Sequence, residues 1–93
     1  IVLAQNPTLD PAFLFEQIEL RESLDEIRQS GSLTRAEAFI QALAEKQNAE
    51  AQAFNDYFKA SALSEATICV YRMQFLSKLS QGAKALEEEL LGY

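Results

Sequence analysis

The stretch AFLFEQIELRESLDEI, residues 12–27, has the length and periodicity of one continuous amphipathic helix. Because helical residues advance by roughly 100° each, four of its apolar side chains fall within about 60° of one another. These four form a stripe that comprises Phe13, Leu20, Leu24 and Ile27. A helix with such a stripe buries it against other elements, so the stretch predicts a helical domain in which this helix has packing partners.

Other side chains of the same stretch point away from this stripe, and they are either apolar or acidic. They are Leu14, Phe15, Ile18, Glu19, Glu22 and Glu26. Adjacent large apolar side chains rimmed by acids are typical of a protein interface. Two ordinary interpretations stay open: Leu14 packs against Leu9 as a staple, and the glutamates form a solvated helix face. A metal site made of three carboxylates without histidine is a remote alternative.

Helix-start and helix-stop residues divide the chain at clear points. Asp10 can cap a first helix whose first residue is Pro11, and Gly31 can take the left-handed conformation that ends it. Thr34 and Glu37 then have the spacing of a capping box, which predicts the start of a second helix.

The second helix is expected to run to about Lys59, and Ser61 or Ser64 can cap a third one that Gly92 closes. Three helices joined by short connections run up, down and up. The predicted fold class is therefore all-α, an antiparallel three-helix bundle.

The second and third helices also carry apolar stripes at helical spacing. The stripe of the second helix comprises Ala36, Phe39, Ile40, Leu43, Ala51, Phe54 and Phe58. That of the third comprises Leu76, Leu79, Ala83, Leu86 and Leu90. The large side chains that we expect to be buried in the bundle are Phe13, Leu20, Leu24, Leu43, Phe54, Leu76, Leu79 and Leu86.

The third helix has a second apolar stripe beside the first, formed by Ile68, Tyr71 and Phe75. A helix with two neighbours buries a wide face, which accounts for Ile68 and Tyr71, whereas Phe75 is open to either a core or a surface position. Cys69 is expected on the core side as an inert thiol.

Length and composition exclude several classes of function. The chain has 93 residues, which suits one domain, and a net charge of −6, which gives no basic surface for nucleic acid or an anionic membrane. No apolar run approaches the ~20 residues of a membrane span. Without histidine and with one cysteine, the common catalytic and metal-binding arrangements are missing. We therefore expect no catalytic residue, no cofactor and no metal site.

The segments AFLFEQIELRESLDEI, RMQFLSKL and ALEEELLGY closely resemble the C-terminal domain of HscB-type J-protein co-chaperones of iron-sulfur cluster assembly. The resemblance covers residues 10–93, and its most specific part is the first helix. It implies a domain that holds the IscU-type scaffold protein in the bacterial cytoplasm. The HscA-type, DnaK-like chaperone is engaged by a separate J domain, whose His-Pro-Asp motif this histidine-free sequence cannot contain. Residues 1–9 would then be an arm left from the connection to that J domain.

The resemblance also implies which residues bind the scaffold. They are Leu14, Phe15, Ile18, Glu19, Glu22 and Glu26 on the first helix, with Phe75 on the third. Phe15 stands where methionine is common in the family and Ile18 where leucine is common, so the shape of the contact can differ slightly. An apolar centre would supply affinity, and a glutamate rim would steer a basic surface of the partner.

Two alternatives come from other classes of protein, and the oligomeric state stays open. A structural bundle that self-associates through the apolar residues of the first helix is one. The other is a small helical chorismate mutase, because the segment LRESLDEI also resembles the opening helix of that family. That active site gathers several cations, but this helix offers only Arg21 and Arg28 before Gly31 ends it.

Overall fold

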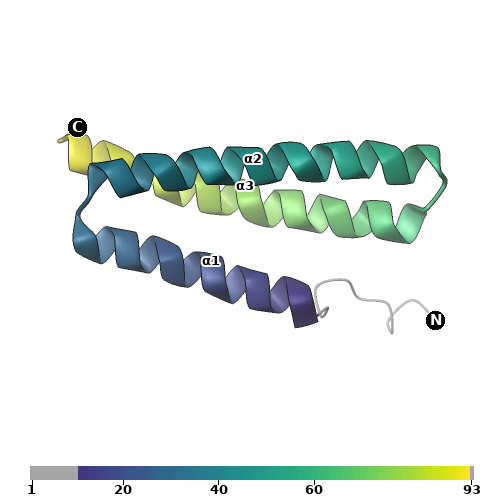
Figure 1. The fold of residues 1–93 in the computed structure, drawn as a ribbon, viewed down its shortest axis with the longest axis horizontal. Helices are drawn as coiled ribbons and strands as arrows, with labels where there is room; N and C mark the ends of the chain where they lie inside the picture. Colours follow the sequence, from purple (N-terminus) through teal and green to yellow (C-terminus); the bar gives the residue numbers. More distant parts are fainter. Residues whose placement is uncertain (1–10, 93) are drawn as a thin grey trace.

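The structure, a computed structural model, describes residues 11–92. It consists of three helices, α1 (Pro11–Ser30), α2 (Leu33–Lys59) and α3 (Leu63–Leu91), and no strand occurs within that range. Figure 1 shows α2 and α3 side by side as a long antiparallel pair, with α1 along one part of it. The predicted all-α, antiparallel three-helix bundle is confirmed.

Helix α1 begins and ends where the sequence predicted. Its first residue is Pro11, and Gly31 follows its last residue with φ +65°, where the Gly31 N–H donates to the Ile27 carbonyl over 3.0 Å. A left-handed residue costs least at glycine, which explains why the helix stops there. The proposed Asp10 cap, the Leu9 staple and the arm at residues 1–9 lie outside the described residues.

The start of α2 differs from the prediction. Ser32 is the N-cap, and its hydroxyl oxygen accepts a hydrogen bond from the backbone N–H of Arg35 over 3.2 Å. The predicted capping box of Thr34 and Glu37 is therefore wrong, because both residues already lie inside the helix. The turn occurs at Gly31, and the residue that follows it, Ser32, has a side chain that can cap a helix. The helix therefore starts earlier than predicted.

Neither Ser61 nor Ser64 caps α3, contrary to the prediction. The N-cap is Ala62, which makes no side-chain cap hydrogen bond. Ser61 instead has φ +59°, and its N–H donates to the Phe58 carbonyl over 3.1 Å. This residue completes the end of α2, so its backbone cannot also take the extended conformation of a helix cap. Gly92, with φ +87°, closes α3 as predicted.

The core forms where α1 lies against the α2–α3 pair, and most of the expected side chains are in it. Six of the eight are buried, namely Phe13, Leu24, Leu43, Leu76, Leu79 and Leu86. Leu20 is partly buried against them, and Phe54 is also only partly buried. The predicted stripe of α3 is confirmed in full, with Ala83 buried and Leu90 packed against the core.

The predicted stripe of α2 is wrong toward its carboxyl end. Ala51 is exposed, and Phe58 is 60% exposed, with its ring stacked on that of Phe54. The cause lies in helix length: α1 has 20 residues, whereas α2 and α3 have 27 and 29. In Figure 1 the α2–α3 connection lies beyond the start of α1, so none of the described helices packs over this end of the pair.

Candidate protein-interaction site

Three large apolar side chains of α1 are exposed on the side away from the core, as predicted. Leu14 is 38% exposed, Ile18 57% and Phe15 64%. They fall within one turn of helix, so they form a single cluster, which we call the α1 patch (Leu14, Phe15 and Ile18). Isolated exposed apolar residues are ordinary, but a contiguous cluster of this kind is typical of a surface that another protein covers.

The three glutamates of the prediction, Glu19, Glu22 and Glu26, are exposed beside this patch. None of them forms an ion pair with another residue in the range 11–92. Their charge is therefore not compensated locally, and it is available to a basic surface brought against the α1 patch.

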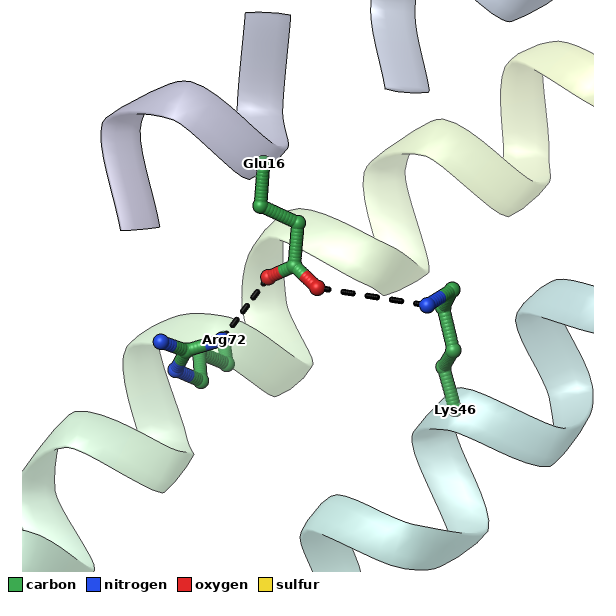
Figure 2. A network of polar contacts seen from close by, with 3 residues as sticks. All are labelled: Glu16, Lys46 and Arg72. Carbon is green, nitrogen blue, oxygen red and sulfur yellow. Dashed lines mark hydrogen bonds and ion pairs between the residues drawn. The ribbon is translucent and has the colours of Figure 1, made fainter. Parts of the chain in front are cut away.

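One carboxylate of α1, Glu16, faces the other two helices and holds α1 in place. Its carboxylate accepts a hydrogen bond from the Arg72 guanidinium of α3 over 2.8 Å, and the Lys46 ammonium of α2 lies 4.0 Å away (Figure 2). The Arg72 guanidinium also lies over the Phe13 ring, 5.0 Å from its centroid. These contacts join all three helices and set the direction in which the α1 patch points.

Sequence reasoning missed this network. Glu16 was grouped with neither the core stripe nor the outward acids, and nothing in a single sequence pairs it with Arg72, which lies 56 residues away. The available signal was that Glu16 lies near the core side of the helical wheel, where a carboxylate needs a partner.

Phe75 is not part of the exposed surface. It is 8% exposed, and its ring packs edge-on against Phe13 with 6.1 Å between the ring centroids. The Arg21 guanidinium covers it on the outside, 5.6 Å from its centroid. Phe75 therefore makes its main contacts within the core, which decides between the core and surface positions that the sequence left open. A direct contact between Phe75 and a partner stays a prediction.

The remaining special residues of α3 behave as structural ones. Cys69 is buried on the core side, as predicted, while Ile68 is half-buried and Tyr71 is 39% exposed. Burial raises the pKa of the Cys69 thiol, and so does the Glu50 carboxylate, as a hydrogen-bond partner and as a like charge, while Arg72 acts in the opposite direction. A thiol with a raised pKa is a poor nucleophile at neutral pH.

The described residues 11–92 contain no group of three or more His, Cys, Asp or Glu side chains that could hold a metal ion. None of the helices in this range combines the length and apolar character that crossing a bilayer requires.

Comparison with known proteins identifies the family. The family model described as the HSCB C-terminal oligomerisation domain matches residues 9–84, which include all of α1 and α2 and most of α3. No solved structure matches the chain. Since the match covers most of the 93 residues, the chain belongs to the HSCB C-terminal domain family, the C-terminal domain of HscB-type co-chaperones.

Proposed function

We propose that this domain holds an IscU-type iron-sulfur scaffold protein for delivery to a DnaK-like, HscA-type chaperone. The observation that carries the proposal is the exposure of Leu14, Phe15 and Ile18 on one face of α1, in a domain of the HscB type. The family resemblance implies scaffold binding at the same three residues.

The surface has the composition that a protein interface needs. The α1 patch would supply an apolar centre that is desolvated on binding, and a few such anchors usually carry most of the binding energy. The unpaired glutamates Glu19, Glu22 and Glu26 would steer a basic surface of the scaffold toward the patch and fix its orientation. No covalent chemistry is required of the domain.

Delivery to the chaperone needs a second domain. The 93 residues contain no histidine, so they lack the His-Pro-Asp motif with which a J domain stimulates its chaperone. We propose that residues 1–9 connect to such a J domain in the complete co-chaperone, and that this chain performs only the scaffold-binding half of the task.

An ATPase assay separates the two halves. Mixed with the HscA-type chaperone and scaffold, this chain should give no stimulation of ATP hydrolysis beyond that of the scaffold alone. Added in excess to the intact co-chaperone, it should lower the stimulation, because it competes for scaffold. Stimulation by the isolated chain, or the absence of competition at saturating concentration, would contradict the proposal.

Self-association is the second candidate function, and two observations favour it. The matched family model carries the description of an oligomerisation domain. The end of the α2–α3 pair that α1 leaves uncovered exposes Phe58 and Leu63, each by 60%. Sedimentation over a range of concentrations decides, because a binding domain that acts alone stays a monomer, whereas a self-associating one shifts to a dimer as concentration rises.

The enzyme alternative has lost most of its support. The matched family is a co-chaperone domain rather than an enzyme family. Of the two cations on α1, Arg21 covers the Phe75 ring and Arg28 pairs with Asp25. Each of these two cations is therefore engaged in a contact within the chain.

A further inference from the structure

A hollow of about 180 Å³ lies between α1 and α3, beside the α1 patch. Phe13 and Phe75, which are 1% and 8% exposed, form its buried base. Its walls are polar: Gln17 and Arg21 come from α1, and Tyr71, Gln74 and Lys78 come from α3. We call this feature the α1–α3 groove.

The groove is basic, although the chain as a whole is acidic. No carboxylate lines it, whereas Arg21 and Lys78 both do. Neither cation forms an ion pair with any residue in the range 11–92. Asp25, one turn beyond Arg21, pairs with Arg28 instead over 3.4 Å, while the Arg21 guanidinium lies over the Phe75 ring. Two uncompensated positive charges thus border one hollow in a chain of net charge −6.

The position of the groove relative to the α1 patch follows from the helical wheel. At roughly 100° per residue, Arg21 lies within about 60° of Leu14 and Ile18, and about 140° or more from Glu19 and Glu26. Glu22 lies about 100° from Arg21, one turn beyond Ile18. The apolar centre therefore has a basic border on the side of α3, while Glu19 and Glu26 form an acidic border on the other side. A partner that covers the α1 patch must meet both borders.

We propose that the α1–α3 groove receives an aspartate or glutamate side chain of the protein partner that docks on the α1 patch. The inference rests on the proposed function and adds to it a specific requirement on the partner. The partner's contact surface has a carboxylate on one side of its apolar centre and basic residues on the other, which permits one orientation on α1 and disfavours the reverse.

The chemistry of the groove suits a carboxylate. An Arg21 guanidinium and a Lys78 ammonium form charge-assisted hydrogen bonds with it, and the side-chain amides of Gln17 and Gln74 and the Tyr71 hydroxyl supply further donors. Once the partner covers the groove, these pairs lose much of their solvent screening, so they contribute more than exposed surface pairs do.

The test uses the complex of this chain with an IscU-type scaffold protein. A carbodiimide joins a carboxylate to an amine only when the two are in direct contact. We expect mass spectrometry to find an amide between Lys78 and one acidic side chain of the scaffold. In titration calorimetry, Lys78→Glu should weaken binding by roughly tenfold, since it places like charges opposite each other.

Lys84→Glu is the matched control, because it makes the same charge change on an exposed residue of α3 that does not line the groove. Its affinity should stay within about twofold of the unaltered chain, in line with the small effect of exposed surface charges. Replacing the cross-linked scaffold carboxylate by lysine should restore the affinity of the Lys78→Glu variant.

The possible failures are distinguishable. If the unaltered chain does not bind scaffold, the proposed function and the groove assignment both fall. If it binds and the Leu14, Phe15 and Ile18 alanine variant does not, the function stands. In that case equal affinities of the Lys78→Glu and Lys84→Glu variants, or the absence of a Lys78 cross-link, overturn the groove assignment alone.

Discussion

Phe15 and Phe75 have opposite environments, since the first is 64% exposed on α1 and the second is 8% exposed beneath Arg21. Removing the Phe15 ring therefore leaves the core intact, whereas removing the Phe75 ring takes away the edge-on partner of Phe13. A substitution of Phe75 that weakens scaffold binding could therefore act in two ways. It removes core contacts that hold α1 in place, and it removes any contact between Phe75 and the partner.

The sequence could identify the exposed residues of α1 but not the burial of Phe75. On α1 the outward residues lie opposite a complete core stripe, so one helical wheel separates them. On α3 the second stripe adjoins the first, and its burial depends on where α1 lies across α2 and α3. That position is set by contacts distant in sequence, such as the 2.8 Å pair between Glu16 and Arg72, which no local pattern reveals.

Cys69 provides a prediction at the scale of one residue. Because the thiol is buried and its pKa is raised, it should react with a thiol reagent far more slowly in the native protein than in urea. The native rate should rise with pH as the small thiolate fraction grows. Absorbance of the released reagent group measures both rates, and native labelling as fast as that of the unfolded chain would show that Cys69 is accessible.

The same shift predicts the direction of one pH effect on stability. Because folding raises the thiol pKa, the contribution of Cys69 is fully present below the unfolded pKa and is lost as the pH rises through the folded one. The free energy of unfolding should therefore fall more steeply in alkaline solution for the unaltered chain than for Cys69→Ala.

At the scale of the helices, α1 depends on a few directed contacts for its placement. Glu16→Gln removes the charge that pairs with Arg72 and Lys46, and both pairs are partly exposed to solvent. We expect the free energy of unfolding, measured in urea, to fall by about 1 kcal/mol. Amide hydrogen exchange should accelerate more in α1 than in the α2–α3 pair, because the lost contacts anchor α1.

Asp25→Asn is the control for this change, since it removes an ion pair that joins two residues of α1 at its exposed surface. Its effect should remain within about 0.5 kcal/mol. Equal losses of stability in the two variants would contradict the anchoring role of Glu16.

The helix boundaries show which local signals a sequence can resolve. Gly31 and Gly92 ended their helices as predicted, because few residues other than glycine take a positive φ at low cost. The caps were ambiguous, since Ser32 and Thr34 are both good N-cap residues. At the first turn the N-cap is Ser32, directly after Gly31. At the second turn Ser61 has a positive φ, and the N-cap Ala62 makes no side-chain hydrogen bond.

At the scale of the whole molecule, the number and direction of the helices could be predicted from the apolar periodicity and from the residues that start and end helices. The length over which the helices pack against one another could not. The sequence predicted a core along the full length of α2, yet Phe58, near the end of α2 that extends beyond α1, is 60% exposed, and Ala51 is exposed as well. An apolar stripe indicates which face of a helix can be buried. How much of that face is buried depends on the length of the helix that packs against it.

The distribution of charge over the molecule makes a kinetic prediction. Replacing Glu19, Glu22 and Glu26 together by lysine should slow association with a basic scaffold surface and invert the dependence of that rate on salt. The reason is that unpaired rim charges steer the encounter more than they hold the complex. Stopped-flow or surface plasmon resonance measurements at several salt concentrations give the association rate. An association rate unchanged by the substitutions would exclude steering by these residues.

Titration calorimetry of this domain against an IscU-type scaffold protein, with and without the α1 patch, tests the central claim most directly. The unaltered domain should bind, and the combined change of Leu14, Phe15 and Ile18 to alanine should nearly abolish binding, since each true anchor contributes roughly 2 kcal/mol or more. Circular dichroism should show unchanged helical content, because alanine favours helix and the buried stripe is untouched. A folded alanine variant that binds scaffold with undiminished affinity would show that the outward face of α1 is not the binding site.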